Sequence, residues 1–176
     1  MKKFSLALAC ALCIFLLASA PGAATELRAT FSGWSLQSID PFVDGTNGRH
    51  THSAGRGRLG AFETGGFSEL LPAAGTPCGS DDSDTRFELV YLTSNAVIRY
   101  VRDGSLLLTE LVDGTVCFDT DDNTFTFDIH RSIIGGTGRF EGASGFLDST
   151  GSGARIGGTG GTTGFTGTSS GTLILP

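Results

Sequence analysis

The stretch that decides the fold is Ile133-Ile134-Gly135-Gly136-Thr137-Gly138-Arg139-Phe140-Glu141-Gly142-Ala143-Ser144-Gly145. Two isoleucines end a strand-like run, and a glycine-rich turn follows them. Glycine tolerates positive φ and close approach of another backbone, so this density predicts a tight corner between two β-strands.

Short alternating segments precede the corner. They include 27–34, 86–92, 96–102 and 124–133, where Phe125, Phe127 and Ile129 alternate with polar residues. Asp103-Gly104 and Asp113-Gly114 each separate two apolar runs, which predicts hairpin turns. Residues 56–62 resemble a glycine-weakened strand, whereas 40–55 and 72–84 are rich in polar and turn residues and are predicted to be loops. We therefore predict an all-β protein.

The corner has a partial echo. Ile156-Gly157-Gly158-Thr159-Gly160 repeats the pattern that begins at Ile134, and Phe165-x-Gly167 repeats Phe140-x-Gly142. Two copies are too few for a solenoid, so we expect either two similar corners or glycine-rich low complexity. Residues 172–175 predict a last strand that pairs with the first and closes the sheet.

The N-terminus is typical of a secretory signal peptide. A basic Met1-Lys2-Lys3 precedes an apolar run and small residues up to Ala24. We expect cleavage near that point, leaving residues 25–176 as a single domain; a retained membrane anchor is the alternative. The expected location is the cell exterior or the periplasm, without stable membrane insertion after cleavage.

The mature chain is predicted to be acidic. It holds ten arginines, eighteen Asp and Glu residues and no lysine, for a net charge of −8. Nucleic acid is therefore not expected as a partner, and lysine-based catalysis is excluded. Two cysteines remain, Cys78 and Cys117, which are expected to form a disulfide in an oxidising compartment; two free buried thiols are the alternative.

Two polar clusters raise the question of a metal. His50-Thr51-His52 has the spacing of metal ligands on an extended segment, with Asp44 or His130 as a third ligand. Residues 119–123 start like a calcium loop but lack its later glycine and glutamate, and a disulfide would bring them near the acidic residues 81–84. The simpler interpretation of both is solvated loops, so we predict no metal and no cofactor.

Strand alternation suggests a binding face. Arg99 shares a face with Val97 and Val101, and Arg131 shares one with Phe125 and Phe127. If these faces are internal, the residues are candidates for ligand binding, and a buried Arg131 needs either a carboxylate partner or an anionic ligand. The candidate carboxylates are Glu63, Glu69, Glu88 and Glu110. The alternative places Arg131 at the rim of the fold.

The corner also carries a family resemblance. Its glycine–phenylalanine pattern resembles the allene oxide cyclase and dirigent barrel superfamily, in particular uncharacterised secreted bacterial members. The matching positions are Gly135, Gly136, Thr137, Gly138, Phe140, Gly142, Ala143 and Gly145. The resemblance implies an antiparallel barrel of about eight strands with an apolar interior.

The resemblance does not by itself imply an activity, and two roles are compatible with the sequence. One is a binding module for a small apolar ligand, or a structural or interaction module, as a monomer or an oligomer. The other is a cofactor-free cyclase or isomerase that acts on a lipid-like or polyketide-like substrate in the lumen, since characterised members fix the shape of reactive substrates there. Their catalytic residues have no match here, so no catalytic residue is predicted.

Overall fold

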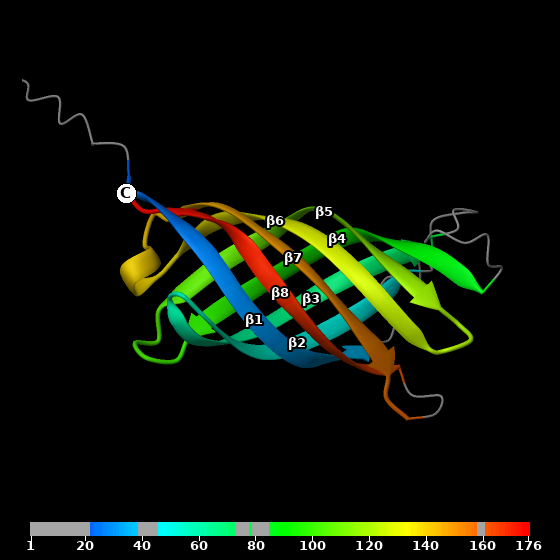
Figure 1. The fold of residues 1–176 in the computed structure, drawn as a ribbon. Helices are drawn as coiled ribbons and strands as arrows, with labels where there is room; N and C mark the ends of the chain where they lie inside the picture. Colours follow the sequence, from blue (N-terminus) through cyan, green and yellow to red (C-terminus); the bar gives the residue numbers. More distant parts are fainter. Residues whose placement is uncertain (1–21, 39–45, 73–77, 79–84, 158–160) are drawn as a thin grey trace, which may run out of the picture.

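The computed structural model describes residues 22–38, 46–72, 78, 85–157 and 161–176, which form a closed eight-stranded antiparallel β-barrel (Figure 1). Its strands are β1 (Ala24–Gln37), β2 (Asn47–Gly57), β3 (Gly60–Pro72), β4 (Arg86–Tyr100), β5 (Leu106–Asp119), β6 (Thr124–Gly136), β7 (Ser144–Arg155) and β8 (Thr162–Ile174). A short 3-10 helix, η1 (Gly138–Phe140), joins β6 to β7. The predicted all-β barrel is confirmed.

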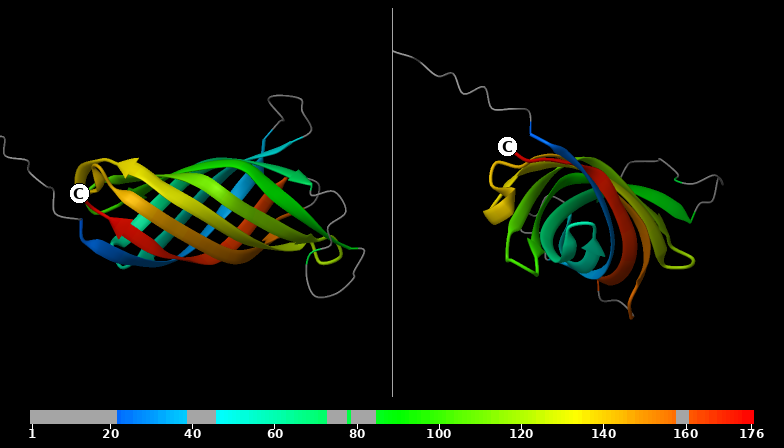
Figure 2. Two further views of the ribbon diagram at one scale, coloured as in Figure 1. Left: turned by 90° about the horizontal axis from the view of Figure 1, so that it is seen from above. Right: turned by 60° about the vertical axis from the view of Figure 1, so that its left-hand side comes forward.

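Each strand pairs with its neighbours in sequence, and β1 pairs with β8 to close the barrel (Figure 2). Closure leaves no exposed strand edge, which suits a chain whose described part has no lysine to protect one. The predicted pairing of the last strand with the first is therefore correct.

The corner at 133–145 has the predicted form. Gly138 and Gly142 adopt φ of +60° and +70°, values that favour glycine. The turn carries Phe140 into the barrel end, where the residue is 1% exposed and its ring lies 4.9 Å from that of Tyr100. The similar segment at 156–167 differs from this corner, because Phe165 lies within β8 and faces the lumen. Residues 158–160 of that segment lie outside the described parts.

Four predictions about strands and turns were wrong. Most of the predicted loop at 40–55 forms β2, with 40–45 outside the described residues. The predicted strand at 56–62 contains the turn between β2 and β3. Asp113-Gly114 is not a hairpin but lies inside β5, and 86–92 and 96–102 belong to one strand, β4, that runs to Tyr100. Cross-strand pairing in the closed barrel overrides these local turn and loop signals.

The two strands concerned, β4 and β5, each contain a bulge. The pairing register shifts between β3 and β4 and twice between β5 and β6, so that Leu92 on β4, Val112 on β5 and Ile134 on β6 are extra residues. All three point outward and are 52%, 63% and 53% exposed. A bulge bends its strand and reverses the alternation of side chains beyond it. Tyr91 and Ser94, three residues apart, consequently both face the lumen.

A hydrophobic core fills one end of the barrel. It includes Leu107, Phe140 and Leu173, which are at most 1% exposed, packed with Tyr100 and Ile133. Burial of this apolar surface stabilises the fold and narrows the lumen at the end where η1 lies.

Cys78 and Cys117 form the predicted disulfide, which joins the segment between β3 and β4 to β5. The predicted signal peptide at 1–24 lies almost entirely outside the described residues, apart from Gly22, Ala23 and Ala24, the last of which begins β1. Within the described ranges, no helix is long and apolar enough to cross a membrane.

Candidate functional site: the barrel cavity

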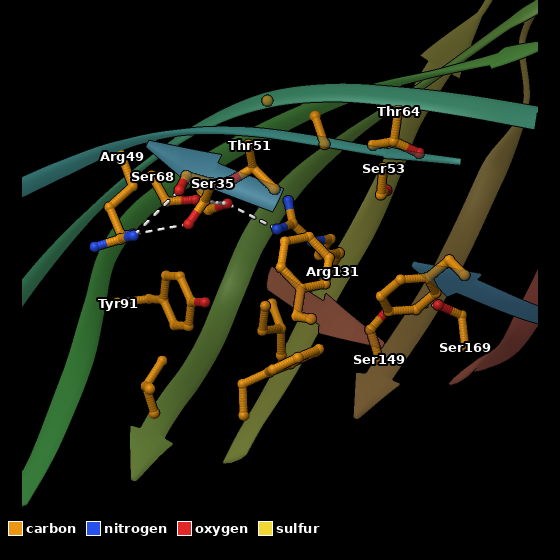
Figure 3. Close-up of a pocket in the computed structure, with 18 of the residues that line it drawn as sticks. Ser35, Arg49, Thr51, Ser53, Thr64, Ser68, Tyr91, Arg131, Ser149 and Ser169 are labelled. Carbon is orange, nitrogen blue, oxygen red and sulfur yellow. Dashed lines mark hydrogen bonds between the residues drawn. The ribbon is translucent and has the colours of Figure 1, made fainter. Parts of the chain in front are cut away.

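The barrel encloses a cavity of about 520 Å³, a size typical of small-molecule sites. Side chains from all eight strands line it, because alternate residues of each strand point inward. The lining is mainly apolar, with arginines, the tyrosines Tyr91 and Tyr100 and several hydroxyl groups set among the apolar residues. Figure 3 shows Tyr91 beside some of these polar groups.

Arg131 on β6 projects into the lumen. Its Nη2 donates to Ser94 Oγ at 2.8 Å, and Ser94 Oγ lies 2.7 Å from Ser68 Oγ. Its Nη1 is buried without a hydrogen-bond partner among the described residues. Burial lowers the pKa of the Arg131 guanidinium, because the charged form is poorly solvated there. The group nevertheless stays charged at neutral pH, since arginine titrates far above that range.

Arg49 on β2 is a second lumen cation, held by neutral acceptors. Its Nε donates to Ser35 Oγ at 2.9 Å, and its Nη2 donates to the Gly161 carbonyl at 2.8 Å and to Thr163 Oγ1 at 3.2 Å. These contacts tie β2 to β1 and to the start of β8. Burial also lowers the pKa of Arg49. No described carboxylate neutralises either guanidinium.

Tyr91 on β4 projects into the same part of the lumen as Arg49 and Arg131 (Figure 3). Burial raises the pKa of its hydroxyl to about 12, while the positive charges of Arg131 and Arg49 act in the opposite direction. Desolvation is the larger effect, so the hydroxyl remains protonated and able to donate at neutral pH. It makes no hydrogen bond with the described residues.

Phenylalanine rings form much of the apolar wall. Phe31, Phe127 and Phe165 lie within 6.0–6.3 Å of one another, centroid to centroid, and Phe125 lies 6.4 Å from Phe127. Each ring covers a glycine on a neighbouring strand, as Phe127 covers its pairing partner Gly151. The absent glycine side chains leave room for the rings and so shape the cavity.

The four predicted ligand-binding residues separate into two groups. Phe125, Phe127 and Arg131 line the cavity. Arg99 lies on the outer face, 58% exposed, with its Nη1 3.5 Å from Glu63 Oε2. Val97 on the same strand and Val101 in the turn that follows it are also exposed, at 41% and 53%. The prediction that Arg99 lies on a lumen face was therefore wrong, because this apolar face of β4 is turned toward solvent.

The candidate carboxylate partners of Arg131 do not reach it. Glu63 pairs with Arg99, and Glu110 accepts a hydrogen bond from Ser132 on the outer face. Glu69 and Glu88 alternate with inward-facing neighbours on their strands and do not line the cavity. The sequence suggested that a buried Arg131 needs either a carboxylate partner or an anionic ligand. Among the described residues, no carboxylate fills that role.

The candidate metal ligands do not come together among the described residues. His50 makes a tilted ring contact with Phe67 at 5.1 Å, and His52 stacks on Trp34 at 5.7 Å. His130 lies across the barrel on β6. Asp44 and residues 81–84 fall outside the described ranges. Asp119 instead accepts a hydrogen bond from Arg86 at 2.9 Å, which holds the pKa of the carboxyl below its usual value. In the described residues, no group of three or more ligands is placed to hold a metal.

Sequence reasoning missed Arg49 and Tyr91. Arg49 lies in the stretch predicted to be a loop, although Arg49, Thr51 and Ser53 alternate with the two histidines in a strand-like period. Tyr91 was correctly predicted to lie in a strand. Its position beside Ser94 and Arg131 depends on the bulge at Leu92, which the alternation of apolar and polar residues does not reveal.

No protein-family model and no curated protein sequence matches the chain. The candidate site therefore rests on its own geometry.

Proposed function

We propose that this protein binds a small, largely apolar ligand inside its barrel. The cavity of about 520 Å³, walled by phenylalanines and furnished with a few oriented polar groups, is the observation that carries the proposal. The resemblance of 135–145 to secreted barrels of the allene oxide cyclase and dirigent type supports the same role. A secreted or periplasmic location is proposed with it, on the basis of the N-terminal sequence and the disulfide.

A cofactor-free cyclase or isomerase is the alternative. Such reactions rely on a positioned acid and base inside the pocket. The described lining offers arginines, a tyrosine with a high pKa and hydroxyl groups, but no Asp or Glu. This composition favours binding over proton-transfer chemistry.

The test is binding of phenylnaphthylamine, an uncharged dye that fluoresces in apolar pockets. Ala96→Phe on β4 and Val116→Trp on β5 each place a large ring in the lumen, and each should abolish the fluorescence increase. Ala54→Phe, on the exposed face of β2, is the matched control and should bind like the wild type. Equal dye binding by folded lumen variants, or none by the wild type, would refute a lumen site.

A further inference from the structure

We propose that the ligand of the cavity is an organic monoanion. Its carboxylate or sulfonate is held by Arg131 and Tyr91, beside the positive charge of Arg49, and its apolar body lies among the phenylalanines. This inference rests on the proposed binding function and specifies its ligand class.

The first argument is the distribution of charge between the two faces of the wall. The cavity lining includes five arginines and no described Asp or Glu. Arg49 and Arg131 lie inside the lumen, whereas Arg28, Arg58 and Arg155 are exposed and Arg28 pairs with Glu26. Yet the whole chain holds eighteen acidic residues and only twelve basic ones. Described carboxylates such as Glu63, Asp128 and Asp148 lie outside, where they meet Arg99 or His130. Although the chain as a whole is acidic, the two cations inside the lumen, Arg49 and Arg131, have no described carboxylate in the cavity lining.

The second argument is the free-energy cost of burying the Arg131 guanidinium without a counterion. A cation removed from water is strongly destabilising unless an opposite charge or a full set of hydrogen bonds compensates it. Arg131 has one hydrogen bond, to a serine hydroxyl, and a buried Nη1 without a partner among the described residues. A bound anion would supply the missing countercharge.

The third argument is the match between donors and acceptors. The free donors are those of the Arg131 guanidinium and the Tyr91 hydroxyl, while Arg49 is already committed through Nε and Nη2. A carboxylate or sulfonate oxygen pair can accept from a guanidinium side by side. A phosphate monoester brings nearly two charges and three oxygens, which is more than these donors would satisfy.

The fourth argument concerns the rest of the ligand. The rings of Phe127 and Phe125 lie on the same strand and the same inner face as Arg131, and Phe31 and Phe165 complete the wall. An apolar body attached to the acid group would be covered by these rings. An inorganic anion alone would leave that surface unused.

The experiment compares two dyes with one skeleton. Anilinonaphthalene sulfonate carries the anion, and phenylnaphthylamine is the same molecule without it. Wild-type protein should bind the sulfonate more tightly. Arg131→Gln should weaken sulfonate binding by about tenfold to a hundredfold, as loss of hydrogen bonds to a charged group does, and leave the neutral dye nearly unchanged.

Arg99→Gln is the matched control, because it removes the same charge from the outer face. It should change neither affinity. Tyr91→Phe keeps the ring and removes one donor, so it should weaken only the sulfonate, and it serves if Arg131→Gln does not fold. Competition by decanoate but not by decanol would extend the preference to carboxylates.

The outcomes separate the two proposals. If neither dye binds, the lumen-binding function itself fails. If both dyes bind equally, or if Arg131→Gln and Arg99→Gln weaken the sulfonate to the same extent, binding in the lumen stands and the anion preference is overturned.

Discussion

Adjacent residues of β6 face opposite sides of the barrel wall and meet opposite environments. Arg131 points inward and has only a neutral hydrogen-bond partner, whereas His130 points outward among three carboxylates. His130 Nδ1 lies 2.7 Å from Asp148 Oδ1, and its Nε2 lies 3.7 and 3.8 Å from Asp128 and Asp113. The same strand thus places a cation without a described counterion in the lumen and a histidine among three carboxylates on the outer face.

The environment of His130 predicts a pH-dependent contribution to stability. The hydrogen bond to Asp148, followed by the charges of Asp113 and Asp128, raises the pKa of His130 in the folded protein. The native state therefore binds its proton more tightly than the unfolded state does. The stabilisation should be fully present below the unfolded pKa of about 6.5 and lost as pH rises through the folded pKa.

Urea unfolding of wild type and His130→Gln at a series of pH values measures this effect. The difference in unfolding free energy should shrink as pH rises from 6 to 8. Asp148→Asn keeps the histidine but removes its closest partner, so the dependence should weaken. A difference that is constant with pH would contradict the prediction.

At the scale of the elements, glycines and phenylalanines pair across neighbouring strands. Gly151 on β7 faces Phe127 on β6, and a Cβ at position 151 would lie 2.5 Å from the Phe127 ring and also press on the Thr166 carbonyl. The bulges at Leu92 and Val112 act at the same level of the barrel, where they turn Tyr91 and Gly114 toward the lumen. Glycines and bulges together shape the polar and aromatic walls of the cavity.

Gly151→Ala should lower the free energy of unfolding by about 1–3 kcal/mol, because the added methyl overpacks the strand pair. Gly65→Ala is the matched control, since nothing lies within 4 Å of a Cβ there. It should be close to neutral, or slightly stabilising through reduced entropy of the unfolded chain. Denaturant unfolding of both variants tests the contrast, and equal losses of stability would refute it.

At the scale of the whole molecule, closure and one covalent link hold the barrel together. The β1–β8 pairing joins the two ends of the described chain, and the Cys78–Cys117 disulfide closes a loop with a sequence separation of 39 residues. The disulfide restrains the part of the barrel where Phe118 and Arg155 line the cavity.

Cys78→Ser combined with Cys117→Ser should reduce the free energy of unfolding by about 4 kcal/mol, the loop-closure entropy expected for this separation. Thermal unfolding with and without reductant provides the measurement. Reductant should lower the Tm of wild type and leave the double variant unchanged. A wild type that is indifferent to reductant would show that the link contributes little.

The sequence by itself determined the all-β class, the disulfide pair, the corner at 133–145 and the pairing of the last strand with the first. These follow from local signals: alternation, glycine density and cysteine count. It also placed Phe125, Phe127 and Arg131 on one face of one strand.

Only the tertiary structure decided which faces enclose the cavity. Alternation says which residues share a face, not where that face points, and Val97 and Val101 show that an outer face can be apolar as well. Arg99 and Arg131 are therefore equivalent by pattern, yet one meets Glu63 in solvent and the other enters the lumen. Arg49 and Tyr91 join Arg131 because β2 completes the barrel and the bulge in β4 reverses the alternation of side chains, and both depend on pairing between strands.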